Sequence, residues 1–254
     1  MTAGLAGRGT THPAGLLPRD HSEECLILYA DRVGETEHDR ATSTAPRLRR
    51  DAALNRERII EAARAAFAER GIDASLEHIA KNAGIAIGTL YRHFPRRVDL
   101  LLAAFEDKFR TFMDATDVAL ASDDPWAGLS SYLETLCGMQ AGDRGFNDFV
   151  SMRFPASKET EAMHDQVCDA MERILARAQD AKLARPDLTI GDLIAVTWAN
   201  SRIIEATNDI APRAWRRQLL LMLESFRYRD ENTLDEPPLT NQQLYEAMAR
   251  LSRP

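Results

Sequence analysis

Residues 75–95 read S-L-E-H-I-A-K-N-A-G-I-A-I-G-T-L-Y-R-H-F-P, and this stretch decides the fold around it. The apolar residues that begin at Leu76 are spaced i, i+3, i+4 and i+7, which predicts a short helix capped by Ser75. Gly84 interrupts this spacing and permits a sharp turn. A second short helix is then predicted over about 86–93. Two short helices joined by such a turn are typical of a helix-turn-helix.

The two predicted helices divide their apolar and polar residues between opposite sides. The apolar positions that would hold the pair together are 76, 79, 80, 85, 90 and 94. The outer face of the second helix would carry Thr89, Tyr91, Arg92 and His93, and a helix with such a face fits the major groove of DNA. Arg96 and Arg97 open the next helix, where side-chain and backbone N–H groups attract phosphate.

Helical periodicity continues on both sides of this segment. A helix carrying Ile59, Ile60, Ala63 and Phe67 ends before Gly71, and Pro95 opens a longer one whose stripe runs from Val98 to Phe112. Further helices are predicted over about 125–139, 143–152, 157–183, 190–207, 212–226 and 240–251. Because no run alternates like a half-buried strand, the sequence predicts an all-α protein.

Composition excludes several classes of protein. The 254 residues carry a net charge of −7 and three cysteines, Cys25, Cys137 and Cys168. An odd, sparse set of cysteines argues against a disulfide framework and favours a reducing, cytoplasmic location. We expect no membrane span and no secretion signal, because no apolar run is long enough for either. An acidic total also argues against nucleic acid as a partner.

Charge counted by segment reverses that last inference. Residues 46–98 hold 11 Lys and Arg against 6 Asp and Glu, whereas residues 99–254 hold 17 against 26 and residues 1–45 hold 4 against 7. One small basic region is therefore attached to a larger acidic one. The predicted division is an extension (1–45), a DNA-binding domain (46–112), a regulatory domain (113–228), and a linker with a short helix (229–254).

The N-terminal part leaves two alternatives open. Residues 1–45 are rich in Gly, Thr, Ser and Pro, so they are expected either to form a disordered extension or to precede the true start codon. The basic cluster Arg47, Arg49 and Arg50 stands before the first predicted helix. It is either a solvated tail or an arm that contacts phosphates or the minor groove.

The stretch 55–112 resembles the DNA-binding domain of the tetracycline-repressor (TetR) family. The resemblance rests on I-I-E-A-A-R-A-A-F-A-E-R-G (59–71) and on A-G-I-x-x-G-T-L-Y-x-H-F (83–94). It implies that Thr89, Tyr91 and His93 touch phosphates or bases, and Arg97 falls where the family usually has a phosphate-binding lysine. The predicted DNA-contacting set is Arg47, Arg49, Arg50, Ser75, Ile87, Gly88, Thr89, Tyr91, Arg92, His93, Arg96 and Arg97.

Two positions depart from the family pattern, and two have alternatives. Ala86 replaces the usual Ser or Thr cap of the recognition helix, and His78 stands where an acidic residue is common. A lost cap costs roughly 1 kcal/mol. Tyr91 could instead be a core aromatic, and His93 could be a surface cap beside Pro95.

The C-terminal half is similar, through D-P-W-A-G-L (124–129), A-G-D-R-G-F (141–146) and A-P-R-A-W-R-R (211–217), to regulatory domains of that family. The resemblance implies binding of a small molecule and dimerisation through the last two large helices. Candidate pocket residues, which by default are core, are Phe105, Phe109, Trp126, Tyr132, Phe149, Met152, Met163, Met171 and Trp198. Candidate dimer residues are Trp198, Trp215, Leu219, Met222, Leu223 and Phe226, because helix 212–226 is apolar nearly all round.

Other functions have weaker support. His164 and Cys168 stand four apart, but two ligands without a third are a poor metal site, and core packing is the better interpretation of Cys168. No catalytic or cofactor motif is present. The sequence therefore predicts a homodimeric transcriptional regulator, most simply a repressor, that binds an operator in double-stranded DNA and a small effector. A helical adapter that has lost DNA binding is the alternative.

Overall fold

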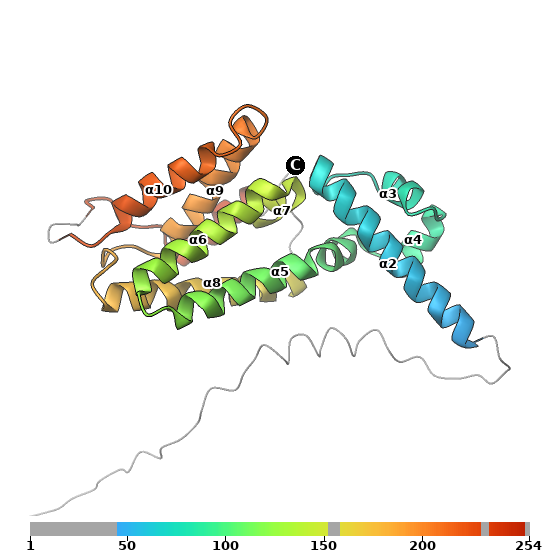
Figure 1. Cartoon of the computed structure of the whole chain (residues 1–254), viewed down its shortest axis with the longest axis horizontal. Coiled ribbons are helices and arrows are strands. Elements are labelled where there is room, and N and C mark those ends of the chain that lie inside the picture. Colours follow the sequence, from blue (N-terminus) through green and yellow to red (C-terminus); the bar gives the residue numbers. More distant parts are fainter. Residues whose placement is uncertain (1–44, 152–157, 230–233, 252–254) are drawn as a thin grey trace, which may run out of the picture. The chain divides into compact units, whose positions relative to one another are not determined.

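The helix-turn-helix region begins with one long helix. The computed structural model describes residues 45–151, 158–229 and 234–251, and its first helix is α2 (Ala45–Arg70), followed by α3 (Leu76–Asn82) and α4 (Ile87–His93) (Figure 1). Helix α2 starts at Ala45, so it includes the basic cluster that the sequence placed before the first helix. Arg47, Arg49 and Arg50 therefore lie in the first turns of α2 and not before the helix. Pro46 suits a first turn, and no Gly or Pro follows before Arg70 to interrupt the helix.

The turn between α3 and α4 has the predicted geometry. Gly84 has φ +66°, and the N–H of Ile85 donates to the carbonyl of Ala80 at 3.0 Å. The apolar positions close beneath the turn, because Ile79 and Leu90 are fully buried. Caps also follow the sequence: the hydroxyl of Ser75 accepts from the N–H of His78 at 3.4 Å, whereas Ala86 supplies no side-chain cap to α4.

Seven further helices make up the rest of the described chain. They are α5 (Arg97–Ala121), α6 (Pro125–Gly142), α7 (Arg144–Val150), α8 (Lys158–Asp180), α9 (Ile190–Thr207), α10 (Ala214–Phe226) and α11 (Asn241–Leu251). Asp124 caps α6 by accepting from the N–H groups of Trp126 and Ala127 at 2.9 and 3.2 Å. Helix α5 runs unbroken across the boundary predicted after residue 112, so both halves of the chain share it.

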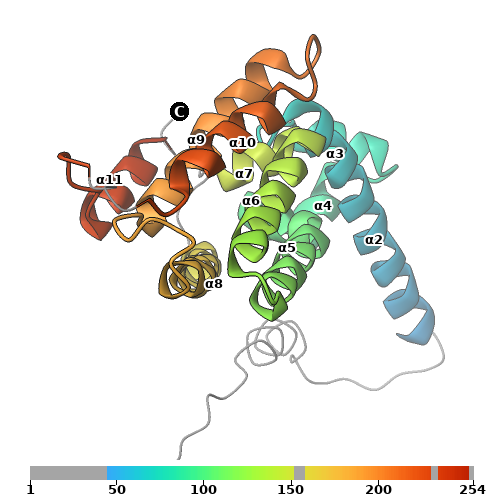
Figure 2. The ribbon, with the colours of Figure 1, turned by 60° about the vertical axis from the view of Figure 1, so that its left-hand side comes forward.

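The described residues confirm the all-α prediction. Their only bridge of strand type is an isolated pair between Ala184 and Arg227. Residues 48–254 form one compact unit, and residues 1–47 form another, of which the structure describes only 45–47. In that unit α6 packs against α5, α8, α9 and α10, so it is the central helix of the C-terminal half (Figure 2). Among the described residues, no helix is long and apolar enough to cross a membrane.

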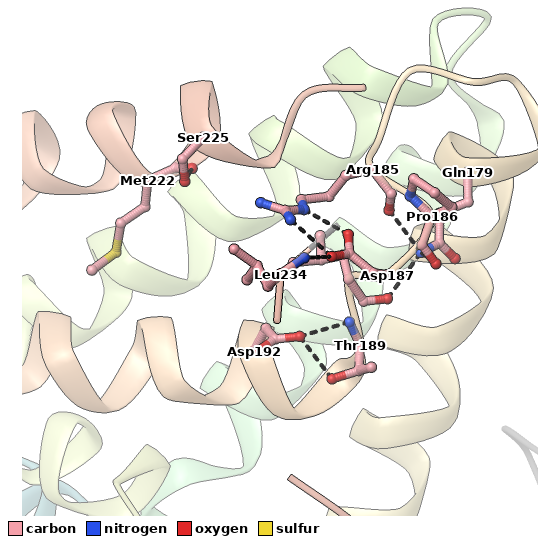
Figure 3. Close-up of polar contacts among 10 residues, drawn as sticks. Gln179, Arg185, Pro186, Asp187, Thr189, Asp192, Met222, Ser225 and Leu234 are labelled. Atoms are coloured by element: carbon pink, nitrogen blue, oxygen red, sulfur yellow. Dashed lines mark hydrogen bonds and ion pairs between the residues drawn. The ribbon is translucent and has the colours of Figure 1, made fainter. Parts of the chain in front are cut away.

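The connection between α8 and α9 anchors the C-terminal segment (Figure 3). The guanidinium of Arg185 donates to both carboxylate oxygens of Asp187, at 2.6 and 2.8 Å, and Asp187 also accepts from the N–H of Leu234 at 3.2 Å. The Gln179 amide donates to the carbonyls of Arg185 and Leu188. Farther along, Leu244 of α11 is only 6% exposed, and Thr240 and Gln243 form the predicted reciprocal cap. The segment after α10 is therefore packed on the helical half.

Candidate nucleic-acid interface

Helix α4 presents a polar outer face. Tyr91 is 47% exposed, so its interpretation as a core aromatic is wrong. Gly88 and Arg92 are also exposed, and Ile87 and Thr89 are half-buried. The opposite side of the helix is fixed by Leu90 and by Phe94, whose ring carries the guanidinium of Arg56 at 5.3 Å. A rigid helix with one buried and one polar side has the form needed to enter a major groove.

His93 lies at the end of α4 in a half-buried position. Burial and the positive charges of Arg92 and Arg56 lower the pKa of its imidazole. In the protein without DNA this shift favours the neutral imidazole near pH 7.

Arg96 and Arg97 begin α5 in very different environments. Arg96 is exposed and forms the N-terminal cap, with its Nε 3.0 Å from Oδ1 of Asp99. Arg97 points back into the domain, where its guanidinium donates to the carbonyls of Ile72 and Ala74 and lies 6.0 Å from the ring centroid of Phe67. Burial lowers the pKa of Arg97. The Arg97 donors that the sequence assigned to phosphate therefore bind the α2–α3 loop.

Ser75 and the N-terminal arginines complete the predicted set. Ser75 is exposed at the start of α3, where its hydroxyl also donates to Glu77 at 2.6 Å. Arg50 is exposed on the first part of α2, whereas the side chains of Arg47 and Arg49 lie outside the described residues. The geometry brings the α4 residues onto one surface. The donors of Arg97, in contrast, point to the carbonyls of the α2–α3 loop.

Helix α7 contacts the α2–α3 loop, which the sequence did not predict. The Asp148 carboxylate accepts from the N–H of Ile72 at 3.2 Å, next to Gly71, whose φ is +80°. A Cβ added to Gly145 would stand 2.8 Å from the Cβ and the carbonyl oxygen of Phe67, so α7 lies directly against the backbone of α2. The sequence signalled only Gly145, which lies in A-G-D-R-G-F, and nothing in the pattern identifies its partner Phe67 or the bond made by Asp148.

The predicted pocket residues do not share one environment. Phe105 packs with Phe67, Phe146 and Phe149, at centroid distances of 5.2 to 6.0 Å, and so belongs to the aromatic cluster that joins α2, α5 and α7. Trp126 is buried beneath the guanidinium of Arg227, 4.5 Å from its centroid. The rest divide by exposure: Tyr132 and Met171 are buried, Phe109, Met163 and Trp198 are partly buried, and Met152 lies outside the described residues.

The predicted dimer residues are also divided. Leu219 and Leu223 are 1% and 4% exposed and belong to the core of their own chain, and Trp215 lies on α6, with its ring 3.6 Å from where a Cβ of Gly138 would be. Met222, Phe226 and Trp198 are partly buried. The apolar surface of α10 is instead carried by Leu220 and Leu221, 47% and 54% exposed, which the prediction omitted. Residues at i and i+4 lie on the same side of a helix, so Leu219 and Leu223 are buried together while the opposite face of α10 stays exposed.

Cys137 and Cys168 pack in or against the core. Burial raises the pKa of the Cys137 and Cys168 thiols to about 12, so both remain protonated and unreactive near neutral pH. Cys168 is half-buried against the core, and the side chain of His164 lies outside the described residues. Among the residues that were described, no cluster of three metal-ligating side chains occurs.

Known proteins match both halves of the chain. Residues 59–104 match the family described as "Bacterial regulatory proteins, tetR family", and residues 124–227 match "Transcriptional regulator SbtR-like, C-terminal domain". The HTH-type transcriptional repressor KstR of Rhodococcus jostii (strain RHA1) is 27% identical over 151 residues, which cover 58% of this chain and 71% of that protein. The HTH-type transcriptional regulator SAUSA300_2515 of Staphylococcus aureus (strain USA300) is 50% identical over 54 residues, which cover 21% of this chain and 29% of that protein.

Solved structures share the fold. The transcriptional regulator FadR from Bacillus subtilis, in complex with stearoyl-CoA, has a TM-score of 0.53 and 19% identity, and the match covers 66% of this chain and 96% of that one. The ketosteroid transcriptional regulator KstR2 of Mycobacterium tuberculosis also has a TM-score of 0.53 and 19% identity, covering 68% and 95%. With the helix-turn-helix and both family matches, the conclusion follows: the chain belongs to the TetR family of DNA-binding transcriptional regulators.

Proposed function

We propose that this protein is a homodimeric repressor that reads a palindromic operator with α4 and leaves it when an effector binds. The observation that carries the DNA-reading role is the exposed face of α4, with Tyr91 and Arg92 outward while Leu90 is fully buried. Arg92 is the residue best suited to read a base, since arginine contacts guanine bidentately. Two copies of α4 should lie ~34–36 Å apart to meet successive major grooves.

The effector and dimer roles rest on the C-terminal half. Binding of stearoyl-CoA by the B. subtilis FadR shows that a protein of this fold can hold an acyl-CoA, and it supports a small-molecule effector here. The outer face of α10 supports a dimer, because Leu220 and Leu221 lie in an open groove of about 350 Å³ bordered by Arg213, Arg216, Arg217 and Glu224. We propose that the effector is bound and released unchanged, and that the protein acts on DNA in the cytoplasm.

The experiment is selection of the operator from random duplex DNA by the full chain, followed by mobility shifts over a salt titration. We expect one enriched palindrome. Arg92→Ala should relax the preference at one base pair per half-site, at a cost of about 1–3 kcal/mol. The matched control is Arg173→Ala, which removes an exposed arginine on α8, outside the helix-turn-helix and outside the helices expected to form the dimer, and should leave operator affinity unchanged.

Two outcomes would contradict the proposal. Equal affinity for every duplex would remove the operator-reading role, and an effect of Arg173→Ala as large as that of Arg92→Ala would remove the assignment to α4. The dimer is tested separately by sedimentation, where changing both Leu220 and Leu221 to Glu should give a folded monomer. A variant that remained dimeric would place the dimer contact elsewhere.

A further inference from the structure

The junction of α6, α7 and α9 contains a cluster of buried, uncharged polar side chains. Its members are 0 to 6% exposed, and we call them the polar junction: Gln140, Asn147, Ser151, Thr197, Asn200 and Ser201. Positions 197, 200 and 201 share one face of α9, so this face meets α6 and α7 with polar groups rather than apolar ones.

Part of the polar junction is internally bonded. The amide nitrogen of Gln140 donates to Oδ1 of Asn147 and to the carbonyl of Thr197, both at 3.2 Å. The hydroxyls of Ser151 and Ser201 are 2.8 Å apart, and Ser151 also lies 2.7 Å from the carbonyl of Asn147. These bonds connect all three helices and fix the orientation of the side chains.

Other hydrogen-bonding atoms of the polar junction are unpaired. Within the described part of the chain, Oε1 of Gln140 and both amide atoms of Asn200 have no hydrogen-bond partner, although these residues are 0% and 1% exposed. Buried amides are normally paired, because an unpaired one loses its bonds to water without replacement. Two acceptors and a donor are therefore held ready inside the helical half.

The charge of the surroundings limits what could fill this place. All six residues of the polar junction are neutral. Asp143, the N-cap of α7, and Asp148 within α7 have other partners: Asp143 accepts from the N–H of Phe146 and lies 3.5 Å from Lys108, and Asp148 bonds to Ile72. With no countercharge among the described residues of the junction, an ionised group would be desolvated without compensation.

We propose that the polar junction is the recognition site for a neutral hydroxyl- or carbonyl-bearing effector, whose polar group bonds to Asn200 and Gln140. The proposal rests on the proposed function, since it names the chemistry of the effector. It also supplies a route to DNA. A ligand group that bonds to Oε1 of Gln140 acts on the same amide whose nitrogen holds Asn147 of α7, and α7 contacts the α2–α3 loop through Asp148 and Gly145.

The test compares three probes of one scaffold on the full-length protein: 2-naphthol, its isostere 2-methylnaphthalene, and 2-naphthoate. Dissociation constants are measured by calorimetry. We expect 2-naphthol to bind at least about tenfold more tightly than either of the others, because a site built around hydrogen bonds rejects an analogue that lacks them. Equal affinity for 2-naphthol and 2-methylnaphthalene, or no binding of 2-naphthol, would overturn the proposal. A structural water that stays in the junction and pairs with these amides would also give equal affinities, and so would also overturn the proposal.

Variants locate the effect. Asn200→Leu keeps the branched shape of the side chain and removes both unpaired atoms, so the preference for 2-naphthol should fall below about threefold, while the ligand-free Tm should rise. Thr116→Val is the control, because the hydroxyl of Thr116 is equally buried but already bonds to the carbonyl of Phe112 at 3.2 Å. It should retain the tenfold preference. If Asn200→Leu does not fold, Gln140→Met carries the same comparison, and retention of the preference in the folded variant would overturn the assignment.

Operator binding by the unsubstituted protein separates the two proposals. Where the operator is bound but the three probes bind alike, only the effector chemistry is wrong. Where no operator is selected at all, the proposed function is wrong whatever the probes show.

Discussion

The core beneath α4 and the junction of α6, α7 and α9 are two buried regions built on opposite principles. Ile79, Leu90 and Phe94 close the first with apolar side chains, at most 3% exposed. Neutral amides and hydroxyls close the second, and among the described residues several of their atoms have no partner. Apolar packing needs no further group to complete it, whereas an unpaired amide gains by finding one. The apolar core suits a rigid recognition helix, and the polar junction suits a regulatory half that binds a ligand.

The largest expected effect comes from a cavity in the apolar core beneath α4. Leu90→Ala would leave a cavity under α4, where Leu90 is fully buried, and should lower the free energy of unfolding by about 2–5 kcal/mol. Chemical denaturation measures it, with Leu54→Ala as control because that side chain is 48% exposed. If both variants lost the same stability, the rigid core under α4 would have no special role.

The next effect concerns the contact between the two regions. Gly145→Ala would force a methyl group to within 2.8 Å of Phe67 backbone and Cβ atoms, and should cost about 1–3 kcal/mol and weaken operator binding. Gly142→Ala is the matched control, since a Cβ there meets nothing within 4 Å. Thermal unfolding and mobility shifts report both quantities. A Gly145→Ala protein as stable as the Gly142→Ala protein would show that α7 does not press on α2.

A smaller effect tests the role of Arg97. Arg97→Lys keeps the charge but loses the planar fork that reaches the carbonyls of Ile72 and Ala74, so we expect a loss of about 1–2 kcal/mol of stability. Arg97→Ala should lose at least as much stability yet leave the salt dependence of operator binding unchanged, because the Arg97 donors are used by the two carbonyls. A phosphate contact by Arg97 would instead reduce the salt slope of the Arg97→Ala protein by about one unit, which a salt titration of the mobility shifts measures.

The sequence predicted helices more accurately than partners. Spacing and turn residues located α3 and α4 almost to the residue, and α9 to the residue, because helical periodicity and caps such as Ser75 are local signals. The start of α2 was missed because charged helix-forming residues carry no apolar stripe to mark them. Helical periodicity predicted both the exposed and the buried face of α4.

Side-chain direction was the part that the sequence did not contain. Arg97 could as well reach a phosphate as a carbonyl, and only the position of the α2–α3 loop decides. Leu219 and Leu220 are neighbours in the sequence, yet one is 1% and the other 47% exposed, because α6 and α9 cover a single face of α10. The polar junction was missed because amides and hydroxyls scattered over residues 140–201 show no pattern until three helices bring them together.

The smallest effect adds to the apolar region instead of breaking it. Ala86 has φ −71° and ψ 145°, the extended geometry of an N-cap, but no side-chain oxygen to bond the open N–H groups of α4. Ala86→Ser should therefore raise the free energy of unfolding by about 0.5–1 kcal/mol. Ala127→Ser is the control, because Asp124 already caps that helix end. Denaturation curves of the two variants decide it: an unchanged Ala86→Ser protein would mean that the packing of Leu90 and Phe94 alone fixes the start of α4.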